Sequence, residues 1–246
     1  MKNYNYLITT VVLVFILSLT LCAKKETKED FVSLFDGKTL NSWKIPEGDN
    51  GHWRVVDGVI DYDGKSEAPG DKSLWTEKEY KDFILKVDWR LTKQPVEVEV
   101  PIVLPDGNYI LKTDETKTTL DSREAKTVKV MDAGDSGIYL RGSSKSQLNI
   151  WSWPIGSGEV YGYRTDKDMP PEVRKGVTPT KNADKPAGEW NTFIVTMKGE
   201  LLTVVLNGET IIENAQLPGV PPIGPIALQH HTDPVQFQNI YIKELE

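Results

Sequence analysis

Apolar and polar side chains alternate along much of the chain beyond residue 30. In the segment "FILKVDWRL", residues 83–91, five apolar side chains share one face, and the opposite face has three charged residues and one isoleucine. A period of two is typical of a half-buried β-strand, because successive side chains of a strand point to opposite faces. The segments "NTFIVTMKG" and "VQFQNIYIKEL" alternate in the same way. The pattern therefore predicts a protein built from β-strands.

Short turn sequences separate two pairs of these strands. Asp57-Gly58 lies inside "WRVVDGVIDY", and Asn207-Gly208 lies inside "LLTVVLNGETIIEN". Both dipeptides are strong β-hairpin signals, because both of their residues tolerate a positive φ. No segment beyond Cys22 keeps an apolar helical stripe for three turns. The chain is therefore expected to be all-β, with about a dozen strands in a sandwich or barrel.

Two long segments interrupt the alternation. Residues 95–130 contain a proline-bracketed strand pair around Asp106-Gly107 and then a charged stretch. This segment is interpreted as an insertion between two core strands, and a plain surface loop is the alternative. Residues 164–188 are rich in Pro, Lys and Asp and have no periodicity, so they are predicted to be a loop. Loops of this length often form the rim of a binding site.

The N-terminus has the pattern of an export signal at residues 1–22. Lys2 precedes an apolar run at residues 7–21, which is too short for an easy membrane span and ends at Cys22. This placement resembles the lipidated cysteine of a bacterial lipoprotein, with the charged residues 23–30 as a tether. The alternative is an ordinary signal with an incidental cysteine, since Leu21 is larger than the residue usual at that point. The prediction is an exported protein of the cell envelope, held to a membrane by a lipid on Cys22.

Composition and missing motifs narrow the function classes. The 246 residues have a formal net charge of −7, with 39% hydrophobic and 26% charged residues. Nucleic acids are bound by clustered Lys and Arg, which this chain lacks, so no nucleic-acid partner is expected. No zinc-protease, paired-cysteine, EF-hand or glycine-rich nucleotide motif occurs. No cofactor is therefore expected, and the alternative is a divalent cation at His230 or His231 with Asp233, which no motif indicates.

Residues 134–153, "GDSGIYLRGSSKSQLNIWSW", predict two neighbouring strands whose outer face is both polar and aromatic. Alternation places six side chains on that face: Tyr139, Arg141, Gln147, Asn149, Trp151 and Trp153. A sugar ring offers hydroxyls to amides and guanidinium groups, and an apolar C–H face to indole rings. The stretch therefore predicts a carbohydrate-binding concave sheet. The alternative is that both tryptophans lie in the core and the amides are solvated at an edge.

Six segments resemble one known domain family in the same order: "FVSLFDGKTLNSWK", "HWRVVDGVI", "SLWTEKEYKDFILKVDWRL", "GDSGIYLRG", "GEWNTFIVTMKGELLTVVLNGETI" and "GPIALQHHTDPVQFQNIYIKEL". The family, first called DUF1080, is named after 3-keto-disaccharide hydrolase and is also described as a 3-keto-glucoside 1,2-lyase and 3-keto-2-hydroxy-glucal hydratase. The resemblance covers residues 31–246. It implies one concanavalin A-like jelly-roll domain, a β-sandwich of two antiparallel sheets.

The same resemblance implies an exported bacterial enzyme that degrades 3-keto-glycosides by elimination and hydration, which together amount to hydrolysis. A ketone at carbon 3 makes the proton on carbon 2 acidic, and the oxygen on carbon 1 can then leave. The expected partner is an oligosaccharide or glycoside substrate. A non-catalytic carbohydrate-binding surface protein on the same fold is the alternative, since one fold hosts many functions.

Elimination needs a base at carbon 2, a donor or cation at the carbon 3 oxygen and a proton source for the leaving oxygen. His230 and His231 are candidate bases, because an imidazole titrates near neutrality and one of two adjacent strand residues should face the concave side. Arg141 is the third catalytic candidate. The candidates for substrate binding are Asp135, Tyr139, Gln147, Asn149, Trp151, Glu159 and Tyr161.

Several of these candidates have a plainer alternative. Asp135 either orients a ring hydroxyl or begins a turn. Glu159 and Tyr161 are expected on the next strand, where Tyr161 either donates to an oxyanion or is ordinary packing. Many members of the family have a Glu and then a Gln where this chain has Gln147 and Asn149. An amide is neither acid nor base, so this chain is expected either to bind without turnover or to use another group.

Overall fold

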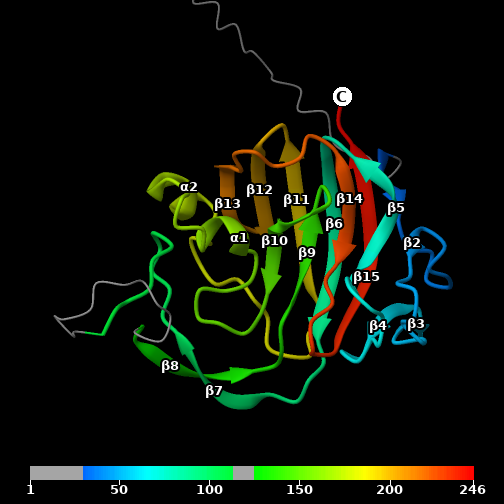
Figure 1. Cartoon of the computed structure of the whole chain (residues 1–246), viewed down its shortest axis with the longest axis horizontal. Helices are drawn as coiled ribbons and strands as arrows, with labels where there is room; N and C mark the ends of the chain where they lie inside the picture. Colours follow the sequence, from blue (N-terminus) through cyan, green and yellow to red (C-terminus); the bar gives the residue numbers. More distant parts are fainter. Residues whose placement is uncertain (1–29, 113–124) are drawn as a thin grey trace, which may run out of the picture. The chain divides into compact units, whose positions relative to one another are not determined.

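The structure, a computed structural model, describes residues 30–112 and 125–246. Its larger sheet is antiparallel and is built from β1 (Val32–Ser33), β3 (Trp53–Val56), β4 (Val59–Tyr62), β6 (Phe83–Leu91), β11 (Asn191–Lys198), β12 (Leu201–Leu206), β13 (Glu209–Gln216) and β15 (Val235–Glu244). The strand order is β13-β12-β11-β6-β15-β4-β3, and β1 also pairs with β15 (Figure 1). Strands that are distant in sequence, such as β6 and β15, are therefore neighbours in the sheet.

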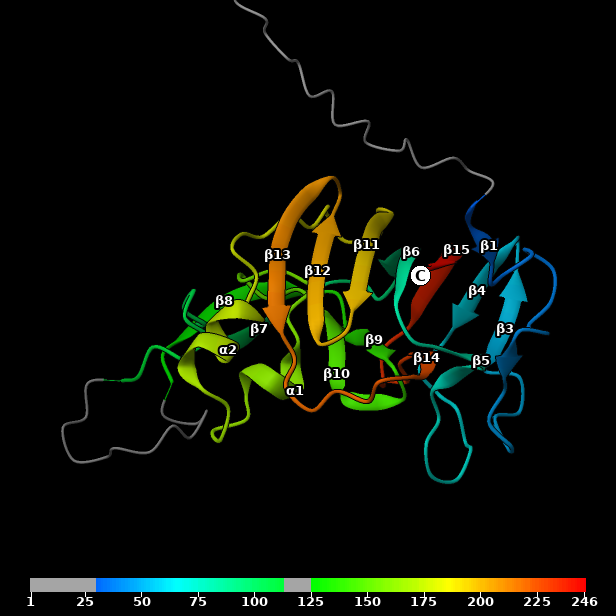
Figure 2. The ribbon, with the colours of Figure 1, turned by 90° about the horizontal axis from the view of Figure 1, so that it is seen from above.

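The smaller antiparallel sheet lies against the larger one. It is built from β2 (Trp43–Lys44), β5 (Leu74–Tyr80), β9 (Ser136–Leu140), β10 (Ser143–Ile150) and β14 (Gly224–Leu228), in the order β10-β9-β14-β5-β2. Figure 1 shows the strands of the two sheets overlapping, and Figure 2 shows the same sheets after a turn of 90°. The all-β sandwich of two antiparallel sheets that the sequence predicts is therefore confirmed.

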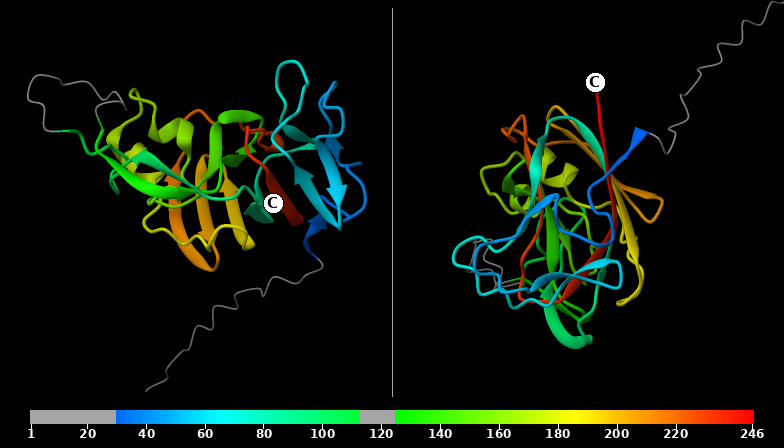
Figure 3. Two further views of the ribbon diagram at one scale, coloured as in Figure 1. Left: turned by 90° about the horizontal axis from the view of Figure 1, so that it is seen from below. Right: turned by 90° about the vertical axis from the view of Figure 1, so that its right-hand side faces the viewer.

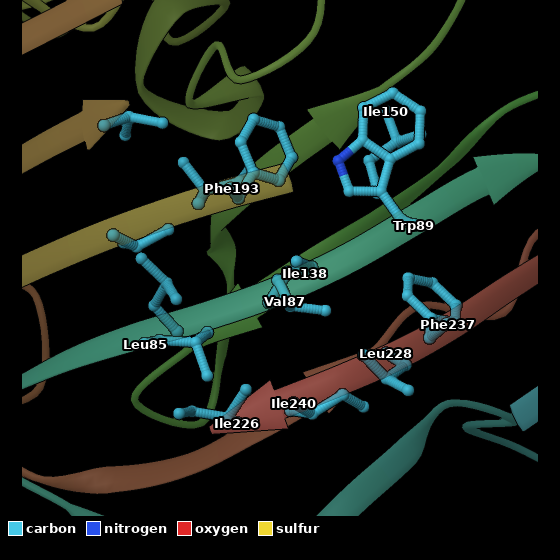
Figure 4. Close-up of a cluster of buried hydrophobic side chains, with 14 of the residues drawn as sticks. Leu85, Val87, Trp89, Ile138, Ile150, Phe193, Ile226, Leu228, Phe237 and Ile240 are labelled. Carbon is cyan, nitrogen blue, oxygen red and sulfur yellow. The ribbon is translucent and has the colours of Figure 1, made fainter. Parts of the chain in front are cut away.

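One hydrophobic core fills the space between the sheets. In β6 the odd-numbered side chains are buried and the even-numbered ones are partly or fully exposed, as the alternation predicts. Figure 4 shows Val87 and Phe193 of the larger sheet with Ile138 and Leu228 of the smaller one. All four of these side chains have less than about 2% of their surface exposed, so each transfers its apolar area from water to the core.

The two predicted hairpin turns have the backbone geometry that their sequences require. Asp57 and Gly58 have φ of 50° and 81°, and Asn207 and Gly208 have φ of 54° and 87°. These turns join β3 to β4 and β12 to β13. Two successive positive φ values are the geometry that matches the right-handed twist of the flanking strands.

The segment interpreted as an insertion contains its own small sheet. Strand β7 (Val96–Pro101) pairs with β8 (Thr127–Asp132) and with neither large sheet. In sequence this pair lies between β6 of the larger sheet and β9 of the smaller sheet. The views in Figure 3 show the pair beside the sandwich. Residues 113–124 between the two strands lie outside the described residues.

Two short helices follow the smaller sheet, α1 (Tyr161–Arg164) and α2 (Pro171–Gly176). Of these, α2 and the last residue of α1 fall within residues 164–188, the segment predicted to be a loop. The prediction of a loop throughout 164–188 was therefore wrong at α2, where Pro171 stands at the first helical position with its φ already suited to a helix. The prediction of a strand at Tyr161 was also wrong, because strand pairing ends with a single bridge between Leu148 and Val160. Periodicity misses helices of four and six residues because they are shorter than two turns.

The export signal and most of the tether lie outside the described residues. Residues 1–29, including Cys22, are not described, so the lipid anchor stays a prediction. Within residues 30–112 and 125–246, no helix is long and apolar enough to cross a bilayer.

Candidate functional site

A pocket of about 220 Å³ lies where the first residue of β9 meets the last residues of β10 and β14. We call it the amide pocket, because three side-chain amides lie in its wall. Its lining residues are Asp135, Gln147, Asn149, Trp151, Trp153, Tyr161, Gln229 and His231. Six of the ten residues singled out from the sequence are among these eight. The strand period explains this grouping, since Leu148 and Ile150 point into the core and leave Gln147 and Asn149 on the opposite face.

The three amides form a connected network. The Nε2 of Gln147 donates to Oδ1 of Asn149 at 2.6 Å and to Oε1 of Gln229 at 2.9 Å. All three side chains are buried, so the network holds them in fixed positions. Gly137 makes room for them, because a Cβ at that position would lie 2.8 Å from atoms of both Gln147 and Gln229. The result is a neutral, preorganised surface of donors and acceptors suited to hydroxyl groups.

An aromatic wall faces this network. Trp151 and Trp153 are stacked with ring centroids 4.0 Å apart and nearly parallel planes. Trp151 is buried, and its Nε1 donates to the carbonyl of Gly156 at 2.8 Å, whereas Trp153 is half-exposed. Tyr161 meets Trp151 edge-on at 6.4 Å and leaves 41% of its surface exposed. This wall provides the apolar area against which a sugar ring can stack.

Asp135 brings an ionisable carboxyl into the pocket. Burial raises its pKa to about 7, and the nearby charges of Asp233 and Asp132 add to the rise. Its Oδ1 is buried without a hydrogen-bond partner, and its backbone N–H donates to Oδ2 of Asp233 at 3.1 Å. Gly134 permits this approach, because a Cβ there would lie 2.7 Å from the Cβ of Asp233. A carboxyl that titrates near neutrality is suited to both removing and delivering a proton.

His231 lines the same pocket, as the alternation with Gln229 predicts. Its Nδ1 lies 3.9 Å from Oδ2 of Asp233 and is buried without a hydrogen bond. Asp233 itself is held by Lys93, whose Nζ lies 2.9 Å from its Oδ1. The pocket therefore contains one carboxyl and one imidazole, both next to the anchored carboxylate of Asp233.

His230 points away from the amide pocket. Its Nδ1 makes a short hydrogen bond with the hydroxyl of Tyr62, whose ring stacks on Trp53 at 4.0 Å. Burial lowers the pKa of His230, and the charges of Lys72 and His231 lower it further. The two adjacent histidines thus lie on opposite sides of the chain, and only His231 is brought to the site.

Arg141 also lies outside the pocket, which corrects the expectation that it faces the substrate. It follows the last residue of β9, has φ of 50° and is 1% exposed. Its guanidinium donates to the carbonyl oxygens of Lys81 and Gly199 at 2.6 Å each and to the carboxylate of Asp82 at 2.8 Å. The alternation ends where the chain turns, so residue 141 no longer shares the face of Tyr139.

Glu159 is fully buried and does not line the amide pocket. Its two carboxylate oxygens accept from Arg164 at 2.5 and 3.2 Å. Complete burial raises the pKa of Glu159, and the attraction of Arg164 opposes that rise. This pair joins the end of the smaller sheet to the β7–β8 segment, because Arg164 also donates to the hydroxyl of Tyr109 at 3.3 Å.

Tyr139 lies beside the pocket without lining it. It is opposite Gln147 in the register of β9 and β10, and its ring lies 5.7 Å from that of Trp75. The sequence did not predict two features of the pocket, the presence of Gln229 and the raised pKa of Asp135. Gln229 had a usable signal, since it precedes His231 by two residues and so shares its face. The pKa of Asp135 had none, because it depends on burial and on charges from residue 233, far along the chain.

The chain matches the model of a 3-keto-alpha-glucoside-1,2-lyase-like domain over residues 30–243. It belongs to this family. A curated relative, the 3-keto-disaccharide hydrolase of Bacteroides thetaiotaomicron, is 25% identical over 259 residues, which cover 89% of this chain and 79% of the relative. The resemblance of the sequence to the family is therefore confirmed.

Two solved structures from Parabacteroides distasonis, each described as a proposed glycosyl hydrolase, share the fold. One has a TM-score of 0.58 at 22% identity and covers 88% of this chain and 84% of its own. The other has a TM-score of 0.51 at 21% identity and covers 89% and 95%. Among residues 30–112 and 125–246, no group of three His, Cys, Asp or Glu side chains is arranged to hold a metal ion.

Proposed function

We propose that this chain is an exported enzyme that degrades 3-keto-glycosides by elimination followed by hydration, with the amide pocket as its active site. The proposal rests on one observation: a buried carboxyl whose pKa lies near 7 shares a pocket with stacked indoles and a network of amides. The family provides the substrate class, and the pocket provides groups that suit that substrate. Export is part of the proposal because residues 1–22 have the pattern of a signal.

The reaction divides into two steps. In the first, a base takes the proton from carbon 2 of the oxidised ring, and the electron pair moves onto the carbon 3 oxygen as an enediolate. The bond between carbon 1 and the leaving oxygen then breaks, and that oxygen receives a proton. A carbon 1–carbon 2 double bond remains beside the ketone. In the second step, water adds across this double bond, so the sum is hydrolysis without any net oxidation.

The residues of the pocket divide these tasks by their chemistry. Asp135 is assigned as the base for the carbon 2 proton, since its carboxylate is poorly solvated and has an unpaired oxygen. His231 is assigned as the proton source for the leaving oxygen, since an imidazolium is a good general acid. The amide network is assigned to the ring hydroxyls and the carbon 3 oxygen, where fixed donors stabilise developing negative charge. Asp135 therefore takes over the role that the sequence assigned to the histidine pair.

Replacement of Asp135 by asparagine tests this assignment. We expect Asp135→Asn to lower turnover of a 3-keto-disaccharide by about 100-fold or more, because general base catalysis contributes factors of that size. On the acid side of its pH profile, wild-type turnover should rise as the pH increases through about 7, because Asp135 acts as a base in its deprotonated form. The proton donor for the leaving oxygen acts in its protonated form, so turnover should fall again at higher pH. Product release is measured by mass spectrometry on the full chain across pH 5–9.

The control is Asp168→Asn, which changes an exposed carboxylate outside the amide pocket. It should leave turnover and its pH profile unchanged. Full activity of the Asp135→Asn variant would refute the assignment of Asp135. Absence of any turnover by the wild type on 3-keto-glycosides would refute the proposed enzyme itself.

One observation supports a second function, a carbohydrate-binding protein without turnover. The network has neutral amides at Gln147 and Asn149, where the resemblance to the family implies a Glu and then a Gln in many members. Calorimetric binding of the 3-keto-disaccharide without product formation would favour this alternative. Stacked indoles and amides serve binding in either case.

A further inference from the structure

A second pocket, of about 340 Å³, lies next to the amide pocket. The two share Trp151 in their walls. The chain from residue 131 to residue 135 passes from one to the other, since Met131 and Ala133 line the second pocket and Asp135 lines the amide pocket. The remaining walls come from the end of β6 and from residues 182–191 before β11. None of the tasks assigned to the amide pocket uses this neighbouring pocket.

Two buried polar atoms in the walls of the second pocket have no hydrogen-bond partner. One is Oδ1 of Asp184, whose other oxygen accepts from the backbone N–H of Ser157 at 2.9 Å. The other is Nε1 of Trp89, a residue that is 2% exposed and extends from β6 (Figure 4). Burial also raises the pKa of Asp184 to about 6. Buried polar groups are paired in most native structures, so an acceptor and a donor left over in one pocket wall indicate a ligand with hydroxyl groups.

The rest of the lining suits a sugar ring. Leu91, Met131 and the indole of Trp151 present apolar surface, and Met131 has 59% of its surface exposed. A pyranose has an apolar C–H face for such a wall, and each of its hydroxyls can donate to one group while accepting from another. One sugar hydroxyl can donate to Oδ1 of Asp184, and one can accept from Nε1 of Trp89. A simple alkyl group would leave both atoms unpaired.

We propose that the second pocket binds the leaving sugar of a 3-keto-disaccharide while the oxidised ring occupies the amide pocket. This inference rests on the proposed function. Trp151 lines both pockets, and residues 131–135 run from one to the other, so a disaccharide that extends across their boundary would have its glycosidic oxygen near Asp135. Binding energy from the leaving sugar then favours the reaction of disaccharides over that of glycosides with a small leaving group.

Two substrates that differ only in the leaving group test the inference. The full chain is assayed with a 3-keto-disaccharide and with methyl 3-keto-glucoside, as wild type, Asp184→Asn and Trp89→Phe. We expect each variant to lower kcat/KM for the disaccharide by about tenfold, the effect of losing a hydrogen bond to a charged or buried partner. The value for the methyl glucoside should stay within about twofold of wild type. Asp168→Asn is the matched control for both substrates.

The two substitutions differ in their structural risk. Asp184→Asn keeps a side-chain oxygen that can accept from the Ser157 N–H, so this variant should keep the wild-type Tm. Trp89→Phe instead changes a core ring that packs 5.5 Å from Phe193. Trp89→Phe is therefore interpreted only if its Tm matches that of the wild type, and Asp184→Asn decides the question otherwise. Equal losses on both substrates, or no loss on the disaccharide, would overturn the inference.

The second pocket can be tested even if the chain proves not to be an enzyme. If the wild type turns over neither substrate, binding of the same two compounds is measured by calorimetry. A disaccharide that binds more tightly than the methyl glucoside, by a margin that Asp184→Asn removes, would support the second pocket. Equal affinities for the two compounds would overturn it.

Discussion

Strand β9 has an ionisable residue at each end, the partly buried Asp135 before its first residue and the buried Arg141 after its last. At the Arg141 end, the guanidinium donates to three backbone carbonyls and to the carboxylate of Asp82. At the Asp135 end, one carboxylate oxygen has no partner, and the charges nearby are two further carboxylates. One strand thus connects a fully paired charge with an incompletely paired one.

The difference teaches that burial of a charge does not by itself mark a functional site. Arg141 stabilises the fold because each nitrogen of its buried guanidinium has an acceptor, and substitution would remove all of these hydrogen bonds together. Asp135 lies in a pocket, and its surroundings raise its pKa to about 7, so its carboxyl can take up and release a proton near neutral pH. Incomplete pairing in a pocket, rather than burial, distinguishes the candidate catalytic residue from the structural one.

The largest change in the free energy of unfolding is expected for Arg141, whose charge is fully paired. Arg141→Met should destabilise the fold by about 3–5 kcal/mol, because it removes a buried guanidinium with its ion pair to Asp82 and its hydrogen bonds to three backbone carbonyls. Urea unfolding of the full chain measures the loss. The matched control is Arg54→Met, which removes an arginine with 44% of its side chain exposed and should cost less than about 1 kcal/mol. Equal losses at both positions would contradict the structural role of Arg141.

Asp135→Asn is expected to stabilise the fold, by less than Arg141→Met destabilises it. The pKa of Asp135 is raised from about 3.8 when unfolded to about 7 when folded, so the folded state keeps a proton that the unfolded chain has lost. The stability from this group is present below pH 4 and disappears as the pH rises through 7. Relative to wild type, Asp135→Asn should therefore gain on the order of 1–3 kcal/mol between pH 5 and pH 8. Urea unfolding at both pH values measures the difference, and a pH-independent difference would show that the carboxyl is not in a desolvated site.

The smallest effect concerns the aromatic wall beside Asp135. Trp153→Ala should weaken binding of a 3-keto-disaccharide by about fivefold, close to 1 kcal/mol, because a stacked indole face is lost. Titration calorimetry with the Asp135→Asn variant as background would avoid turnover. Trp75→Ala is the matched control, since Trp75 is half-buried on β5 but does not line the amide pocket. A larger loss for Trp75→Ala would move the sugar away from the proposed wall.

The sequence predicted the site residues correctly where their position depends on the alternation within one strand. Gln147, Asn149, Trp151 and Trp153 were predicted on one face, and all four line the amide pocket. The alternation predicted the wrong face for a residue that lies beyond the end of the strand. Arg141 lies in the turn after β9, and a positive φ there directs its side chain into the gap beside Asp82 and Gly199.

Tertiary pairing also separated residues that alternation treats alike. Glu159 does not line the amide pocket, and Arg164, in the short helix α1, binds both of its carboxylate oxygens. His230 and His231 are neighbours in sequence, yet only one reaches the pocket, because the hydroxyl of Tyr62 holds the other. No sequence spacing identifies such partners, since Tyr62 lies 168 residues before His230.

The sequence by itself determined the strands, the two tight hairpins, the family and the set of polar and aromatic side chains on β9 and β10. These properties depend on local periodicity, on the φ preferences of single residues and on the order of the motifs, all of which the sequence contains before the chain folds. Only the tertiary structure decided which charges are paired and which are not. Burial, the pKa of Asp135 and the closeness of the two pockets depend on distances between residues far apart in sequence, and electrostatic and solvation energies follow those distances.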